Sequence, residues 1–286
     1  MRRKNILFWI LAILITVASA FYQKMTGPTY PVKGEIQLNS NTIQYKLYTS
    51  HGGDENHLVK ISVPNKSIAG TLFWKRYKTN DEYIVVPMEN IASELSAILP
   101  HQPPAGKLQY YVKLNDNGNE VSISAGEPII IRFKGAVPTG ILIIHVITIF
   151  GAMLLSTRTG FEALRKEKNL KKLTYWTMGF LIIGGLIFGP IVQKYAFGAY
   201  WTGFPYGTDL TDNKTLIAFI GWLFAFVAVI KSKQEKVWII FAAILMFVIF
   251  IIPHSMMGSE LDYNKLDKVK TKIESADNKT DSLTIQ

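Results

Sequence analysis

The feature that most constrains this chain is a series of long apolar runs that carry almost no charge. Four of them fill the second half of the sequence, at residues 138–155, 173–192, 214–230 and 237–252. A helix needs about 20 residues to cross a hydrocarbon core of about 30 Å, and only the last two runs are a little short. Runs of this kind, separated by charged loops, are difficult to bury in a soluble protein. We therefore expect a four-helix transmembrane bundle over residues 138–254.

The first 22 residues hold a fifth apolar run with two interpretations. Basic residues at positions 2–4 precede it, and Ala18-Ser19-Ala20 near its end is typical of a signal-peptide cleavage site. The unbroken apolar stretch from Ile6 suits an uncleaved signal anchor equally well. Residues 1–22 are therefore a signal peptide or an N-terminal transmembrane helix, and we favour the helix.

The position of the charges indicates the orientation of the chain. The sequence has 31 Lys and Arg against 21 Asp and Glu, a formal net charge of +10. If the N-terminus is cytoplasmic, residues 1–5, 156–172 and 231–236 lie inside and hold 12 Lys and Arg against three acids. This is the positive-inside pattern of a multi-pass protein in a bacterial inner membrane. The charge therefore indicates a lipid bilayer as partner and argues against nucleic acid, with residues 23–137 and the polar tail 255–286 on the periplasmic side.

Residues 23–137 are expected to form one exported domain rich in β-strands. Short runs of alternating apolar and polar residues are separated by turn residues such as Asn39-Ser40 and Asn117-Gly118. The predicted strands are 33–38, 42–49, 57–63, 70–76, 82–88, 94–99, 107–114, 120–124 and 128–134. Many short strands at this spacing favour an antiparallel β-sandwich.

Residues that could carry chemistry are scarce in this domain. The sequence has no cysteine, which excludes disulfides, thiolate metal sites and a cysteine nucleophile. His51, Asp54 and His57 share one Gly-rich loop and could offer metal ligands, although such a loop is more often a solvated hairpin turn. We expect a binding or spacing module with no catalytic residues.

One passage of the domain has a familiar pattern. The stretches GTLFWKRYKTNDEYIVVPM (70–88) and ELSAILPHQPPAGKLQYYVKLNDNGN (94–119) resemble the immunoglobulin-like modules of exported bacterial proteins. Those modules repeat a strand, a Pro-x-x-Pro-x-Gly turn and a Tyr-Tyr pair near the end of the sandwich. The resemblance implies an Ig-like fold and nothing about activity.

Two histidines lie near the outer face of the predicted bundle. His145 falls in the outer half of its span, and His254 follows Pro253 at the outer end of the last span. A histidine inside a membrane span usually faces the protein interior, and imidazole is a common axial ligand of haem. Alternatively, His145 donates a hydrogen bond across helices to a Ser, a Thr or a backbone carbonyl, and His254 is interfacial and hydrated.

The loop between these histidines resembles the tryptophan-rich loop of the haem-handling proteins of cytochrome c biogenesis. In this chain the segment Tyr206–Ile217 carries the resemblance, and Ala199-Tyr200-Trp201 precedes it. The matching positions are Gly207, Asp209, Asp212, Leu216 and Ile217. The departures are Thr208, Leu210 and Lys214.

This resemblance implies a haem b site near the outer face. The residues implied for cofactor binding are His145, His254, Trp201, Tyr206 and Asp209. His145 and His254 would be the iron ligands. Alternatives with only one of the two histidines, paired with Met256 or Met257 or without a second ligand, are left open.

The acidic residues of this loop also have a structural interpretation. Asp209 and Asp212 can cap a helix that starts near Lys214, and we favour Asp212 as the cap. Beyond the bundle, four apolar positions form a weak amphipathic pattern suited to lying on the membrane or on the outer domain. They are Leu261, Leu266, Val269 and Ile273.

The sequence thus supports two functions of different classes. The first is an integral inner-membrane protein that binds haem b and serves electron transfer or haem handling, with cytochrome-related or other membrane proteins as partners. The second is a non-catalytic scaffold or partner-recognition protein of a bacterial envelope complex. A transporter is a weaker third option, because the spans show no internal repeats and almost no charge.

Overall fold

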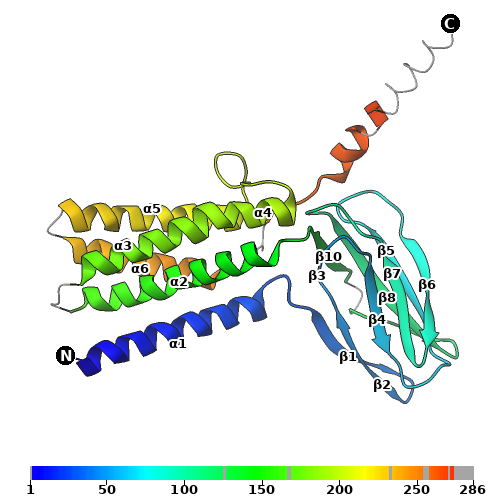
Figure 1. Ribbon diagram of the computed structural model, residues 1–286. Coiled ribbons are helices and arrows are strands. Elements are labelled where there is room, and N and C mark those ends of the chain that lie inside the picture. Colours follow the sequence, from blue (N-terminus) through cyan, green and yellow to red (C-terminus); the bar gives the residue numbers. More distant parts are fainter. Residues whose placement is uncertain are drawn as a thin grey trace, which may run out of the picture. The chain divides into compact units, whose positions relative to one another are not determined.

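The chain forms two compact units, seen in a computed structural model (Figure 1). The structure describes residues 2–124, 127–165, 169–231, 234–253, 258–269 and 271–273, and the side chains from residue 5 onward. The helical unit comprises Met1–Tyr30 and Gly135–Ser259, and the β unit comprises Pro31–Lys134 and Glu260–Gln286. The predicted combination of an N-terminal helix, a β-rich domain and a set of apolar helices is confirmed.

The described residues of the β unit form ten strands. They are β1 (Val32–Leu38), β2 (Asn41–Leu47), β3 (Ser50–Gly52), β4 (His57–Ser62), β5 (Ala69–Arg76), β6 (Ile84–Ile91), β7 (Glu94–Leu99), β8 (Lys107–Asp116), β9 (Asn119–Ser122) and β10 (Ile129–Lys134). Nine of them lie where the sequence predicts strands, and β3 falls in the expected Gly-rich loop. Asn39 and Asn117 adopt positive φ values of 54° and 53° in the predicted turns, a conformation that asparagine tolerates well.

The pairing of these strands gives a near-barrel. β1 and β2 form an antiparallel ribbon, and the other strands form one sheet in the order β3-β10-β8-β5-β6-β7-β4, with β9 beside β8. β6 pairs with β5 through its first half and with β7 through its second, so the sheet is continuous at this strand. The neighbours are antiparallel as predicted, except that β3 runs parallel to β10.

Alternating burial along the strands builds the core of this unit. In β8 every second residue is buried, including Leu108, Tyr110, Val112 and Leu114. The period of two follows from the geometry of an extended strand that covers a core with one face. The buried hydroxyl of Tyr110 donates to the carbonyl of Tyr48 at 2.8 Å, which satisfies its polar end.

The helical unit contains one N-terminal helix and a bundle of later helices. They are α1 (Arg2–Thr26), α2 (Thr139–Ala163), α3 (Leu170–Leu181), η1 (Ile182–Phe188), α4 (Gly189–Phe197), α5 (Leu210–Lys231) and α6 (Glu235–Ile251). α3, η1 and α4 form one unbroken helical stretch, in which η1 is a π-helix. Each predicted span is therefore helical.

Four helical stretches among the described residues are long and apolar enough to cross a membrane. They are Asn5–Thr26, Thr139–Ala163, Leu170–Phe197 and Leu210–Lys231. The fifth predicted span corresponds to α6, whose 17 residues extend about 26 Å at 1.5 Å per residue. α6 packs against α2 and α5, and Trp222 of α5 is fully buried in the shared core.

One face of α1 belongs to this packing. Ala12, Thr16 and Ser19 are buried at helical spacing, whereas Leu14 and Val17 on the opposite face are 59% and 62% exposed. α1 contacts both α2 and α6. The N-terminal helix is thus an integrated part of the helical unit.

Candidate functional site

The loop between α4 and α5 carries most of the predicted site residues. α4 ends at Phe197 and is followed by Gly198, whose φ of 86° is the left-handed conformation of a glycine C-cap. α5 begins at Leu210, four residues before the predicted start. The carboxylate of Asp209 accepts the backbone N–H groups of Thr211 at 2.8 Å and Asp212 at 3.4 Å. Asp209 is therefore the N-cap of α5, and the prediction that Asp212 is the cap is wrong.

Asp212 organises the loop instead. Its Oδ2 atom accepts the backbone N–H groups of Thr202 at 2.6 Å and Gly203 at 3.0 Å, and the side-chain amide of Gln193 at 2.9 Å. Asp212 is 5% exposed, so these donors compensate a carboxylate that is removed from water. The side chain lies in the first turn of α5, where the positive end of the helix dipole also favours an anion.

The second oxygen of Asp209 connects the loop to the end of the helical unit. It accepts the backbone N–H of Ser259 at 2.8 Å and hydroxyl donors from Ser259 at 3.1 Å and Thr202 at 3.2 Å. Nothing in the sequence singles out Gln193, Thr202 or Ser259, because their partners are 7 to 57 residues away. Both acidic residues of the predicted haem loop therefore have structural partners.

The aromatic residues of the loop face outward. Trp201 donates its indole N–H to the carbonyl of Phe204 at 3.0 Å, and Phe204 donates its own N–H to Asn213 at 2.6 Å. Tyr206 is 83% exposed and Phe204 is 69% exposed. Trp201 and Tyr206, both predicted to bind a cofactor, thus lie in one loop, where the Tyr206 side chain is largely exposed.

His145 lies on α2 and donates a hydrogen bond to the π-helix. Its Nδ1 atom is 3.0 Å from the carbonyl oxygen of Gly184, and because a carbonyl only accepts, Nδ1 carries the proton. A Cβ at Gly184 would lie 2.7 Å from the backbone nitrogen of Ile149, so glycine permits this close approach of η1 and α2. The predicted alternative, a cross-helix bond to a backbone carbonyl, is the one observed. His254, Met256 and Met257 lie outside the described residues.

Two side chains close the C-terminal end of α6. Lys214 of α5 is 5% exposed and donates to the carbonyl of Ile252 at 2.7 Å. Gln23 of α1 donates its amide to the carbonyl of Phe250. The last carbonyls of a helix have no partner within the helix, so these donors from two other helices satisfy groups that would otherwise need water.

The opposite end of the bundle contains a buried ionic cluster. Arg158 and Glu162 of α2 are 3% and 1% exposed and form an ion pair at 2.7 Å. Arg165 lies 3.8 Å from the same carboxylate. Arg158 also hydrogen-bonds the side chain of Asn5, and its guanidinium lies over the ring of Trp9 at 5.4 Å. This cluster therefore fastens α1 to α2.

The Gly-rich loop of the β unit does not form the expected hairpin. β3 pairs with β10 and β4 pairs with β7, and His57 is 8% exposed at the start of β4. His51 donates Nε2–H to the carbonyl of Glu55 at 2.9 Å, so its Nδ1 accepts from Nδ1–H of His57 at 3.2 Å. Burial first, and then the nearby His51, lowers the pKa of His57 to about 4. Across the described part of the chain, Asp54 included, no group of three His, Asp or Glu residues is arranged to hold a metal ion.

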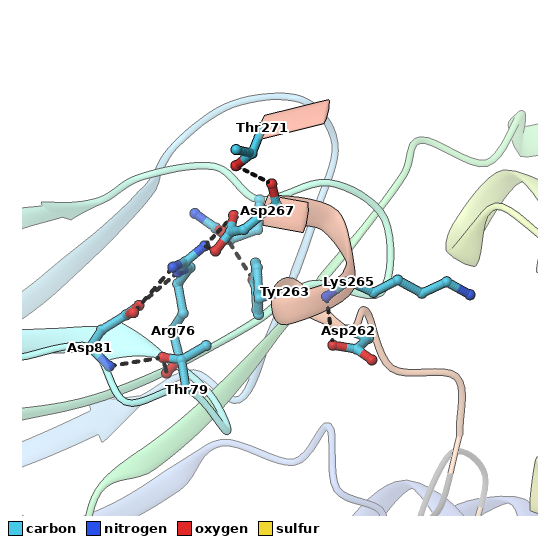
Figure 2. Close-up of polar contacts among 9 residues, drawn as sticks. Arg76, Thr79, Asp81, Asp262, Tyr263, Lys265, Asp267 and Thr271 are labelled. Carbon is cyan, nitrogen blue, oxygen red and sulfur yellow. Dashed lines mark hydrogen bonds and ion pairs between the residues drawn. The ribbon is translucent and has the colours of Figure 1, made fainter. Parts of the chain in front are cut away.

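The C-terminal segment packs on the β unit through charged residues. Arg76 of β5 contacts Asp81 at 2.6 Å and Asp267 at 2.9 Å, and its guanidinium lies 5.2 Å from the centre of the Tyr263 ring (Figure 2). Glu260 contacts Lys107 at 2.6 Å. The sequence predicts a weak amphipathic helix here, but it does not identify Tyr263, which is 4% exposed, as the buried residue.

These contacts shift the titration of several groups. The hydrogen bond from Arg76 lowers the pKa of Asp81, and the same bond raises the pKa of Arg76. Burial alone would raise the pKa of Glu260, but hydrogen bonds from Lys107 and Lys78 outweigh it and lower that pKa. Burial raises the pKa of Tyr263 to about 12. These contacts therefore favour the charged forms of Asp81 and Glu260 and the neutral form of Tyr263.

Comparison of the sequence with protein-family models and with curated proteins finds no match. The function must therefore be argued from the geometry of the two units.

Proposed function

We propose that this chain is an integral protein of a bacterial inner membrane that holds its β unit on the periplasmic face as a non-catalytic scaffold or partner-recognition module. The observation that carries the proposal is the packing of the C-terminal segment on the β unit. Leu261 donates its N–H to the carbonyl of Ala105 at 3.1 Å, and Glu260 and Asp267 pair with cations of the strands.

This packing restricts how the chain crosses a membrane. Residues 31–134 and residues 260–273 must lie on the same side, because they contact each other. The chain between them must then cross an even number of times. α2, the α3–α4 stretch and α5 supply three crossings, so α6 supplies the fourth despite its 17 residues.

The contacts at the end of α6 support this role. Lys214 and Gln23 satisfy the carbonyls of Ile252 and Phe250. A helix that ends below the membrane surface needs such partners, because hydrocarbon offers no hydrogen bonds to the backbone. The positive charge of the segments at residues 1–5, 156–172 and 231–236 supports an outer position of the β unit.

The roles of the acidic and histidine side chains favour recognition over catalysis. Asp209 caps α5, Asp212 binds the loop backbone, and His57 is paired with His51. The outer surface of the β unit carries apolar residues that a partner could cover. Leu58 and Ile98 are directly opposite each other on β4 and β7 and are 43% and 53% exposed.

Photo-crosslinking in the native membrane tests the proposal. A photoreactive phenylalanine replaces Leu58, Ile98 or Ile84 on the β unit, and Phe224, 53% exposed on α5, serves as the matched position on a helix. We expect a discrete protein adduct from at least one β-unit position and none from Phe224. Adducts from Phe224 alone would contradict the proposal.

A second function, haem binding at His145, is favoured by one observation. The bond from Nδ1–H to Gly184 leaves the lone pair on Nε2, which is the arrangement that orients a histidine as a metal ligand. Of the five residues implied by the resemblance, His145 fits this role, whereas Trp201 and Asp209 are engaged in the loop. A Soret band in the purified protein that disappears in His145→Ala but persists in His101→Ala is the expected result. A protein with no Soret band after expression with added haem would contradict it.

A further inference from the structure

The C-terminal segment contacts the β unit in the way that a peptide ligand contacts a receptor. The contacts run along the segment from a backbone bond at Leu261 to the ion pair of Asp267 with Arg76. Glu260 lies between Lys78 at 2.9 Å and Lys107 at 2.6 Å. The acids of the segment thus meet the cations of the strands in a fixed order.

Tyr263 is the anchor of the segment. It is the most buried of the described residues 260–273, at 4% exposure, and its hydroxyl donates to the side-chain carbonyl of Gln102 at 3.0 Å. The space for it depends on Gly106, because a Cβ at that position would lie 2.9 Å from the hydroxyl oxygen. The face of the ring is covered by the guanidinium of Arg76, a cation–π contact. A buried aromatic anchor of this kind is typical of the centre of a binding site.

The receptor side is organised by residues of the β unit itself. Arg76 is held by a two-bond contact with Asp81, at 2.6 Å and 3.1 Å, which leaves Nη1 for Asp267 (Figure 2). Gln102 donates its amide to the carbonyls of Pro100 and His101, so its oxygen is the atom that faces Tyr263. The side chains that recognise the segment are therefore oriented by neighbours other than the segment.

The ion pairs that hold the segment are partly accessible to water, whereas Tyr263 is buried. Arg76 and Asp267 are 30% and 45% exposed, and Glu260 is 29% exposed. Ion pairs at such positions contribute little and are weakened by salt. The segment stays bound mainly because it belongs to the same chain, which gives it a high effective concentration at the site. A ligand from another chain can compete with it.

We propose that the surface formed by Arg76, Lys78, Gln102, Gly106 and Lys107 is a peptide-recognition site for a partner segment with the pattern Glu-Leu-x-Tyr-x-x-x-Asp. The chain's own residues 260–267 occupy the site in this structure and regulate access to it. This inference deepens the proposed recognition function and rests on it. The partner is a linear segment with acids on both sides of a tyrosine.

The test is binding of a labelled peptide to the full-length protein in detergent. The probe is a fluorescent peptide of residues 258–269, GSELDYNKLDKV. We expect it to bind Tyr263→Ala at least 10-fold more tightly than the unmodified chain, because the variant releases the site. Adding Arg76→Ala to that variant should weaken binding at least 10-fold.

Two controls make the result decisive. Asn264→Ala changes an exposed residue of the same segment and should bind the peptide like the unmodified chain. Glu260→Gln with Asp267→Asn opens the segment through its charges and should bind more tightly, like Tyr263→Ala. Equal affinity of all variants for the peptide, or no binding of the peptide to either opened variant, would contradict the proposed recognition site. The crosslinking adducts described above would still stand in that case, which separates this inference from the proposed function.

Discussion

Two arginines of this chain each hold one terminal segment, and they do so in opposite surroundings. Arg158 fastens the N-terminal helix through Asn5 and the ring of Trp9, and it is 3% exposed beside Glu162. Arg76 fastens the C-terminal segment through Asp267 and the ring of Tyr263, and it is 30% exposed.

The difference in burial between the Arg158 and Arg76 clusters indicates how firmly each one holds its segment. A buried ion pair is expensive to break, since removal of one partner leaves an uncompensated charge away from water. A water-accessible pair is screened and exchanges readily. Arg158 therefore binds α1 tightly to the helical unit, whereas we propose that the C-terminal segment is a reversible latch on the β unit.

The largest effect that tests this comparison is expected from Arg158→Ala. The substitution leaves Glu162, 1% exposed, with Arg165 at 3.8 Å as its remaining cation. Loss of one partner of a buried pair typically costs about 3–5 kcal/mol of unfolding free energy. Denaturant unfolding in detergent measures it. Replacement of both residues by Met and Leu should recover most of the loss, and a cost below about 1 kcal/mol for Arg158→Ala would break the comparison.

The next largest effect is the pH dependence of the stability of the β unit. The pKa of His57 is lowered from 6.5 to about 4, so the folded β unit binds fewer protons than the unfolded chain between these values. The stabilisation of the folded β unit by neutral His57 is complete above pH 6.5 and is lost as the pH falls toward 4. The free energy of unfolding changes by up to about 3 kcal/mol over this range. Unfolding of the β unit followed at several pH values measures it. His57→Leu should flatten this dependence, and an unchanged slope would contradict the assignment.

A smaller effect is expected at the latch itself. A double-mutant cycle on Arg76 and Asp267 should give a coupling below about 1 kcal/mol, because both side chains are partly exposed. The same cycle on Arg158 and Glu162 should give several times more. Equal couplings would mean that burial does not distinguish the two clusters.

The smallest effect concerns acid release of the latch. The lowered pKa of Glu260 means that its contribution is present above its ordinary value of 4.5 and is lost as the pH falls through the lowered value. The protection factors of residues 261–269 against hydrogen exchange, corrected for the pH dependence of the intrinsic rate, should therefore fall at low pH and at high salt, before those of β8 change. Exchange that stays constant in both conditions would show that Tyr263 alone holds the segment.

Much of the fold could be predicted from the sequence, because local patterns determine it. Period-two alternation located nine strands, and uncharged apolar runs located each helix of the bundle. The sequence predicts that α5 starts near Lys214 instead of at Leu210, because Asp209 and Asp212 are both acceptable caps. Asp212 instead accepts the backbone N–H groups of Thr202 and Gly203, which lie close to it only in the folded loop.

The candidate sites were less predictable, because they depend on contacts between distant residues. Arg76 and Asp267 are separated by 191 positions, and Lys107 and Glu260 by 153. No periodic pattern marks Tyr263 as buried, since Leu266 and Asp267, three and four residues further on, are only half-buried. The haem and Ig-like resemblances stay predictions, and His254 lies outside the described residues.

The measurement that tests the central claim most directly is cysteine labelling in intact cells. The chain has no cysteine, so single substitutions at the exposed positions Lys66, Lys265 and Lys171 report on the β unit, the C-terminal segment and the first turn of α3. A membrane-impermeant maleimide added to cells with a permeable outer membrane should label positions 66 and 265 and not position 171. Labelling of 66 without 265 would place the C-terminal segment on the other side of the membrane and contradict the account.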